Sequence, residues 1–345
     1  MKRSTLVYIA YLISIITLTV LFSIKIISNK KEFQIIGYSP KVLTSNFSNC
    51  PCKEIGTGPP ACPHDFMERS NNSFLSAELR PNYEGIYDGL YLCQSPVYIK
   101  INSYGFRDKE YPLIKPPNAC RIIAIGDSHT FGLGVNLEDS YPKVLERLLN
   151  ERNDGKNYEV LNFGVPGYDI IEKIEVLRSK ALNFSPNIII FQYTGDDIIS
   201  NIELGKEIRK AESELKQKLG RPLTLEERVH FEARIRLKAL KEVDERKAQE
   251  IIKNSFEKLA SYIPFNTEII ILTIHTPEFQ KAPFPEIVKK NHWYIIDLDT
   301  LFFQHSGENL YLNSIDLHLN PFGYQLVTEK IYNLLVEKNI LFNAC

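Results

Sequence analysis

The chain has 345 residues, of which 44% are hydrophobic and 24% are charged, and its formal net charge at pH 7 is −1. These values are ordinary for one large globular domain with an appended segment. Such a balanced charge provides no general basic field, and it therefore argues against a nucleic-acid-binding protein.

The amino terminus predicts a membrane anchor. Residues 6–24 are an uncharged, mostly apolar run, long enough to cross a hydrocarbon core of about 30 Å as a helix. No small-x-small cleavage site follows, so we expect an uncleaved single-pass anchor over residues 1–31, with a buried core helix as the alternative. Basic residues stand on both sides of the run, and charge therefore does not set its orientation.

Residues 32–119 are rich in Pro, Asn, Gly and Tyr and predict a loop-rich pre-domain, with one strand near residues 97–101. Clustered cysteines in such a segment indicate disulfides and an oxidising, extracytoplasmic compartment, although the sequence fixes no pairing. The six cysteines are Cys50, Cys52, Cys62, Cys93, Cys120 and Cys345. A zinc knuckle formed by Cys50, Cys52, Cys62 and His64 is the alternative, but its spacing matches no ligand framework that we can identify.

The stretch 121–134 organises the rest of the chain. Residues 121–125 are a short apolar run typical of a strand buried on both faces. Gly126 ends this run, and Asp127 and Ser128 follow on a tight turn before a predicted helix over residues 140–150. A serine between a strand and a helix lies at the carboxyl edge of the sheet, so Ser128 is the candidate nucleophile.

Further buried strands alternate with helices along the remainder of the chain. We expect strands at residues 158–162, 187–193, 268–274 and 294–297, each followed by a polar cluster. This alternation predicts a three-layer α/β/α, doubly wound (flavodoxin-like) parallel sheet over residues 120–345, with the polar clusters gathered at one edge.

A second polar pair stands near the carboxyl end. Asp316 and His318 fall on a predicted loop that ends at Pro321, where a final amphipathic helix begins. A carboxylate close to a histidine fixes its tautomer and orientation, so His318 is a candidate base and Asp316 its partner. The alternative is a surface capping cluster.

These motifs resemble those of the SGNH (GDSL-type) hydrolases over roughly residues 102–335. The first family block, G-D-S, matches residues 126–128, and the second, N-x-G-x-x-G, matches Asn162, Gly164 and Gly167. The last block pairs an acid with a histidine before a helix. It is often D-x-x-H, whereas this chain has D-x-H.

The resemblance implies roles for these residues. Ser128 would be the nucleophile, His318 the base and Asp316 its orienter, with an oxyanion hole from the backbone N–H groups of Ser128 and Gly167 and a side-chain amide of the third block. That block is usually G-N-D, but here Asp196 stands where the family has its asparagine. An ionised aspartate donates no hydrogen bond to an oxyanion, so either Asp196 is protonated or it acts otherwise.

The segment 200–247 is an insertion relative to a minimal hydrolase core. Apolar stripes at helical spacing predict a hairpin of two helices, over about residues 204–219 and 225–240, with a third helix over residues 248–259 packed on the sheet. The hairpin leaves the loop after Asp196, so we expect either a lid over the site or a dimerisation arm.

Taken together, the sequence predicts a membrane-anchored, extracytoplasmic serine esterase acting on an acyl ester, such as an O-acetyl ester of a small molecule or glycan. An O-acyltransferase on glycans shares the same first half-reaction, and a non-catalytic ligand-binding module is the alternative outside enzymes. We expect no cofactor or metal, and we interpret His129 and His275 as structural.

Overall fold

The computed structural model of the protein describes residues 66–68, 70–87, 96–221, 223, 231, 234–235, 238–239, 242–313 and 316–345. The predicted anchor over residues 1–31 and the cysteines Cys50, Cys52, Cys62 and Cys93 lie outside these residues. Within the described ranges, no helix combines the length and the apolar character needed to cross a bilayer.

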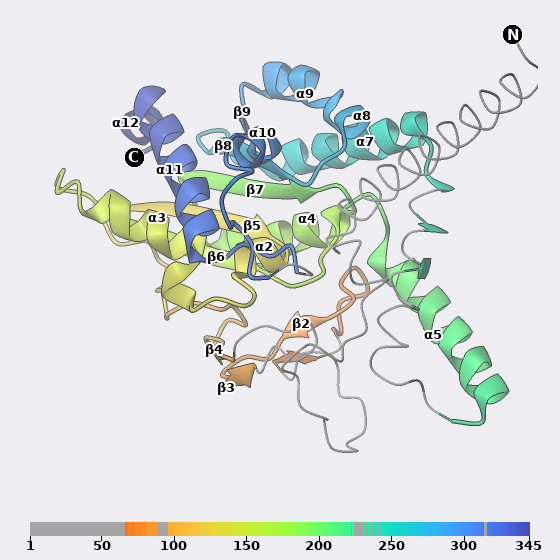
Figure 1. The fold of residues 1–345 in the computed structure, drawn as a ribbon. Coiled ribbons are helices and arrows are strands. Elements are labelled where there is room, and N and C mark those ends of the chain that lie inside the picture. Colours follow the sequence, from red (N-terminus) through yellow and green to blue (C-terminus); the bar gives the residue numbers. More distant parts are fainter. Residues whose placement is uncertain are drawn as a thin grey trace, which may run out of the picture.

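A five-stranded parallel sheet forms the centre of the molecule (Figure 1). The strands lie in the order β6-β5-β7-β8-β9, so the first strand of the sheet in the chain lies between the second and the third. This is the flavodoxin-like strand order. The predicted strands are confirmed: β5 is Ala119–Gly126, β6 Asn157–Gly164, β7 Ile188–Thr194, β8 Glu268–Ile274 and β9 Tyr294–Asp297.

Helices cover both faces of the sheet and confirm the three layers (Figure 1). One face packs against α4 (Ile170–Ser179), α7 (Glu245–Tyr262) and α9 (Phe284–Asn291). The other packs against α3 (Tyr141–Asn150), α10 (Leu298–Gln304), α11 (Pro321–Glu337) and α12 (Ile340–Ala344).

The apolar runs in the sequence follow from this double covering. Successive strand residues point to opposite faces, so Ile123 and Ile125 of β5 enter one core while Ile122 and Ala124 enter the other. All four side chains are fully buried. A strand covered on both faces therefore has no polar alternation, and this absence made β5 recognisable.

The described part of the pre-domain contains two short antiparallel pairs. Strands β1 (Met67–Glu68) and β2 (Glu78–Leu79) form one pair, and β3 (Glu84–Tyr87) and β4 (Val97–Lys100) form the other. The strand predicted near residues 97–101 is thus confirmed as β4.

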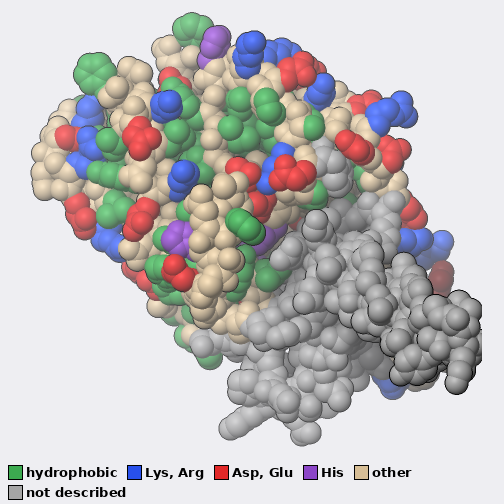
Figure 2. All heavy atoms as spheres, turned by 45° about the horizontal axis from the view of Figure 1, so that its top comes forward, with side chains coloured by type: hydrophobic (Ala, Val, Ile, Leu, Met, Phe, Trp, Pro, Cys, Tyr) green, Lys and Arg blue, Asp and Glu red, His purple; other side chains and the backbone are tan. Residues whose placement is uncertain are grey.

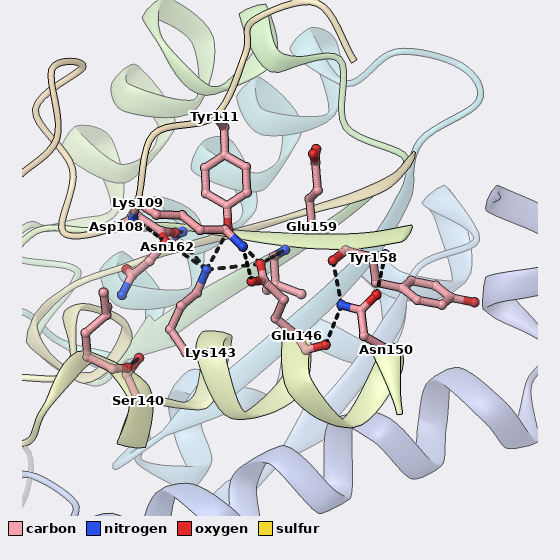
Figure 3. Close-up of polar contacts among 12 residues, drawn as sticks. Asp108, Lys109, Tyr111, Ser140, Lys143, Glu146, Asn150, Tyr158, Glu159 and Asn162 are labelled. Atoms are coloured by element: carbon pink, nitrogen blue, oxygen red, sulfur yellow. Dashed lines mark hydrogen bonds and ion pairs between the residues drawn. The ribbon is translucent and has the colours of Figure 1, made fainter. Parts of the chain in front are cut away.

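The segment after β4 docks on α3 and β6 through a polar cluster (Figure 3). Lys143 of α3 lies 2.9 Å from a carboxylate oxygen of Asp108 and 2.8 Å from the hydroxyl of Tyr111. The second carboxylate oxygen of Asp108 accepts a hydrogen bond from the backbone N–H of Asn162 at 2.8 Å. Residues ahead of β5 are therefore built into the sheet domain.

The carboxyl terminus is tied to the start of β5 by a disulfide between Cys120 and Cys345, whose Cα atoms are 5.3 Å apart. The sequence indicated disulfides but not this pairing. It joins residues 225 positions apart at the edge of the sheet opposite the carboxyl ends of the strands.

The insertion begins with α5 (Asn201–Leu219), which Figure 1 shows extending away from the sheet layers. It starts at an N-cap of Ser200 and ends at Gly220, whose φ of 66° is the left-handed conformation usual at a helix end. The first predicted helix of the hairpin is thus confirmed, and α7 confirms the helix predicted to pack on the sheet. Most of the second predicted hairpin helix lies outside the described residues, so the hairpin and its role as a lid or dimerisation arm stay predictions.

Lys and Arg side chains alternate with Asp and Glu over the face drawn in Figure 2, and neither sign gathers in one large patch there. This mixed surface accords with the net charge of −1.

Candidate active site

The site lies where the connections of the sheet diverge. Strands β5 and β7 are neighbours, but the chain leaves β5 toward β6 on one side and leaves β7 toward β8 on the other. Such a switch point opens a crevice at the carboxyl ends of the strands. The loops that follow β5, β6, β7 and β8 all reach this edge.

The nucleophile turn (residues 126–132) carries Ser128 on a four-residue helix, α2 (Ser128–Phe131). Asp127 is the N-cap, and its side chain accepts a hydrogen bond from the backbone N–H of His129 at 2.9 Å. Ser128 is the first residue of the helix, where a backbone N–H has no acceptor within the helix. Both the hydroxyl and the N–H of Ser128 are thus placed at a helix N-terminus, which favours negative charge.

Two positions of the second block require glycine for steric reasons. A Cβ on Gly164 would lie 2.2 Å from the backbone nitrogen of Phe131, so only glycine lets β6 approach α2. Gly167 has a φ of 82°, which other residues adopt only with strain. The side-chain oxygen of Asn162 accepts from the N–H of Gly164 at 3.0 Å, so this asparagine shapes the turn.

The structure brings Ser128, His318 and Asp316 together across 190 residues of chain. His318 Nε2 lies 2.7 Å from Ser128 Oγ, and its Nδ1 lies 2.6 Å from Asp316 Oδ1. The same carboxylate oxygen accepts from the backbone N–H of His318 at 3.0 Å. A carboxylate only accepts hydrogen bonds, so it holds the proton on Nδ1 and leaves Nε2 to accept from the serine.

The environment strengthens His318 as a base. Burial by itself lowers the pKa of its imidazole, but the charge and hydrogen bond of Asp316 outweigh that effect and raise the pKa above its usual value. The Asp316 side chain is fully buried and that of His318 is 13% exposed, so the pair is largely shielded from water. A shielded pair interacts more strongly than an exposed one.

Behind Ser128, Asp127 belongs to a buried polar network. Its second carboxylate oxygen accepts from Lys173 Nζ at 3.1 Å and from Gln192 Nε2 and Thr194 Oγ1 at 2.9 Å each. Burial opposes ionisation, yet Lys173 and these hydrogen bonds hold the pKa of Asp127 well below its usual range. The network keeps the N-cap of α2 ionised and in place.

The third block lies on the third turn (residues 194–199), directly after β7. Asp196 is partly exposed there, and its carbonyl accepts from the N–H of Ile199 at 3.0 Å. Asp197 is buried, and its carboxylate oxygens lie 2.7 and 2.6 Å from Lys173 Nζ. Burial raises the pKa of Asp197, against the opposing effect of Lys173.

The two histidines that we interpreted as structural lie beside His318. The ring of His129 is 5.1 Å from that of His318 and 5.6 Å from that of His275, measured between centroids. Burial lowers the pKa of His129 to about 3, and it also lowers that of His275. Both rings are therefore neutral at pH 7, whereas Asp316 raises the pKa of His318.

Two residues that support the site were not identified from the sequence. Arg107, before β5, is fully buried and donates to the carbonyl oxygens of Gly132 at 2.6 Å and Val135 at 2.8 Å. Lys173, on α4, is also fully buried. Both carry charged side chains, which sequence patterns assign to solvent, so only tertiary contacts reveal them.

In the part of the chain that the structure describes, no group of His, Cys, Asp or Glu side chains has the arrangement of a metal site. The residues of the alternative zinc knuckle, Cys50, Cys52, Cys62 and His64, lie outside that part.

The family model of the GDSL-like lipase/acylhydrolases matches residues 122–331, more than half of the chain. The chain belongs to this family. The match includes Ser128, Asp316 and His318, whereas Arg107 lies before it.

The solved structures of several other proteins are similar to this chain. A G-D-S-L family lipolytic protein from Veillonella parvula DSM 2008 is 14% identical, with 63% of this chain and 98% of that one covered and a TM-score of 0.41. The lipase/acylhydrolase from Enterococcus faecalis is 15% identical (63% and 96% covered, TM-score 0.41), and the Clostridium thermocellum family 3 carbohydrate esterase is 17% identical (66% and 100% covered, TM-score 0.42). No curated protein matches the chain.

Proposed function

We propose that the protein is a serine esterase that forms an acyl-enzyme on Ser128. The observation that carries this proposal is the continuous hydrogen-bonded path from Ser128 Oγ through His318 to Asp316, with contacts of 2.7 and 2.6 Å. A module that only binds a ligand has no need of a base placed against a hydroxyl, so the same path argues against the non-catalytic alternative.

In the proposed first step, Ser128 Oγ attacks the acyl carbon of the ester while its proton passes to His318 Nε2. The imidazolium that forms is stabilised by Asp316. The tetrahedral intermediate then collapses as its bond to the leaving oxygen breaks, and His318 returns the proton to that oxygen. An alcohol leaves, and the acyl group stays on Ser128.

The developing oxyanion needs donors in this mechanism. We assign the backbone N–H of Ser128, at the N-terminus of α2, as one donor, and the family resemblance adds the backbone N–H of Gly167. An ionised Asp196 supplies none, and one missing donor lowers the rate by about a hundred- to a thousandfold. Asp196 thus makes this site a slower esterase than one with the family's asparagine, unless its carboxyl group is protonated.

The second step decides between hydrolysis and transfer. Water as acceptor releases an acid, whereas a glycan hydroxyl as acceptor makes the protein an O-acyltransferase. We propose hydrolysis of an acyl ester, such as an O-acetyl ester of a glycan or small molecule. We further propose that residues 6–24 anchor the protein with its catalytic domain outside the cytoplasm.

Turnover of a chromogenic acetyl ester by the full chain in detergent tests this function. We expect activity in the wild type, and a loss of about 10³-fold or more in Ser128→Ala and in His318→Ala. Equal turnover by wild type and Ser128→Ala would rule out the proposed nucleophile. Product analysis with an added glycan acceptor separates release of free acid from acyl transfer.

A further inference from the structure

Lys173 of the buried network contacts the carboxylates of two different turns of the site. Its ammonium lies 3.1 Å from Asp127, next to Ser128, and 2.6 Å from Asp197, next to Asp196. Lys173 itself sits on α4, which directly follows the second block. One side chain therefore joins elements that follow three separate strands of the sheet.

The contacts around Lys173 leave it no contact with solvent. Its side chain is 0% exposed, and those of Asp127 and Asp197 are 10% and 2% exposed. Thr194 lies between the same two carboxylates, since its hydroxyl is 2.9 Å from an oxygen of each. The ammonium therefore links the nucleophile turn and the third turn, and the Thr194 hydroxyl, which has one proton to donate, adds a hydrogen bond to one of the two carboxylates at a time.

A gain in folding stability alone does not explain why Lys173 and its two partner carboxylates are buried. Taking an ammonium and its partner carboxylates out of water is costly, and an apolar side chain in such a place is often as stable or more so. The charged network instead fixes geometry, because each carboxylate oxygen has a defined donor and a shift of either turn breaks short charge-assisted contacts. The network therefore holds the two turns at one spacing.

We propose that Lys173 is a positioning residue of the active site, which fixes the nucleophile turn, and with it the hydroxyl and backbone N–H of Ser128, relative to the third turn and α4. This inference rests on the proposed esterase function. Lys173 does not touch the reacting atoms; it acts through Asp127 on α2 and through Asp197 on the third turn.

The test compares Lys173→Met, Asp197→Asn and their double variant, each as the full chain, with kcat and KM for a chromogenic acetyl ester expressed per fluorophosphonate-titrated site. Titration counts only folded, reactive molecules, so a loss of stability does not lower the kcat obtained. Thr194→Val, which removes the hydroxyl link and keeps every charge, is the milder variant should Lys173→Met fail to fold. Arg121→Met is the matched control, because Arg121 is a fully buried cation paired with Glu159 at 2.7 Å near the opposite end of β5.

We expect kcat to fall about 10- to 100-fold in Lys173→Met and in Asp197→Asn, as for a small misplacement of catalytic groups. KM should change less than twofold, and the double variant should be no slower than Lys173→Met, because both changes cut one link. Thr194→Val should lose a smaller factor in kcat. Arg121→Met should keep the wild-type kcat per titrated site while unfolding more easily.

Wild-type kcat per titrated site in Lys173→Met, or in Thr194→Val where the first variant does not fold, would overturn the positioning role and leave the esterase function standing. Losses that multiply in the double variant would also overturn it, since the two residues would then act separately. A wild-type protein that neither turns over the ester nor reacts with the fluorophosphonate would overturn the esterase function, and this inference with it.

Discussion

Arg107 provides a strong test of how the segment before β5 contributes to the site. Its guanidinium donates to the carbonyl oxygens of Phe131 at 3.2 Å, Gly132 at 2.6 Å and Val135 at 2.8 Å, and so binds the carboxyl end of α2 and the loop after it. Burial lowers the pKa of Arg107 to about 10, so the side chain remains charged at neutral pH.

Replacement by methionine keeps the bulk of the side chain and removes these donors. The two shortest contacts are charge-assisted hydrogen bonds, each worth about 1.5–3 kcal/mol, so Arg107→Met should lower the free energy of unfolding by about 3–6 kcal/mol. Urea unfolding, followed by the fluorescence of the single tryptophan, Trp293, measures this change. We also expect a lower kcat per titrated site, because α2 carries Ser128.

Arg152→Met is the control for Arg107→Met. Arg152 lies 3.0 Å from Asp154, and both side chains are 30% exposed, so its loss should cost less than about 1 kcal/mol. If the two variants unfolded at the same urea concentration, the carbonyl contacts of Arg107 would not stabilise the protein as argued.

Three further predictions concern the base, the third turn and the disulfide. Asp316→Asn should lower kcat by about 10⁴-fold. His318 must be neutral to act, and Asp316 raises its pKa. The acidic limb of the kcat/KM profile should therefore lie above the usual histidine pKa in the wild type and move to lower pH in the variant. A limb that stays in place would show that Asp316 does not set this pKa. Asp196→Asn should raise kcat on an acetyl ester by about 10²- to 10³-fold, since it restores an amide donor, and unchanged or lower turnover would refute the missing-donor argument. Cys120→Ser opens a loop of 225 residues and should destabilise the protein by up to about 5 kcal/mol without changing kcat/KM; a variant with the wild-type urea midpoint would show that the Cys120–Cys345 bond does not constrain the chain.

The sheet could be predicted from the sequence because its strands are covered on both faces. Runs such as residues 121–125 and 188–191 have no polar residue at the alternate positions after Arg121, and each strand is followed by a polar turn. Ser128 could be placed at the carboxyl edge of the sheet because it directly follows a buried strand. His318 follows no strand of the sheet, so its pairing with Ser128 was implied by the family resemblance and not by the strand pattern.

The supporting residues could not be predicted in this way. On α4, Glu172 and Lys173 are both fully buried, although adjacent charged residues on an amphipathic helix normally mark the solvent side. Arg107 stands in a loop-rich segment, where an arginine is expected to be exposed. Burial of such charges depends on partners far away in the chain, such as Asp127 for Lys173 and the carbonyls after α2 for Arg107, and these partners are set by tertiary structure alone.

Treatment of the full chain with a fluorophosphonate, followed by location of the adduct by peptide mass spectrometry, tests most directly whether Ser128 and His318 act together as nucleophile and base. We predict one adduct, on Ser128, formed rapidly in the wild type and lost in His318→Ala, because Nε2 of His318 then no longer accepts the serine proton. An unlabelled wild-type protein, an adduct on another residue, or undiminished labelling of Ser128 in His318→Ala would contradict it.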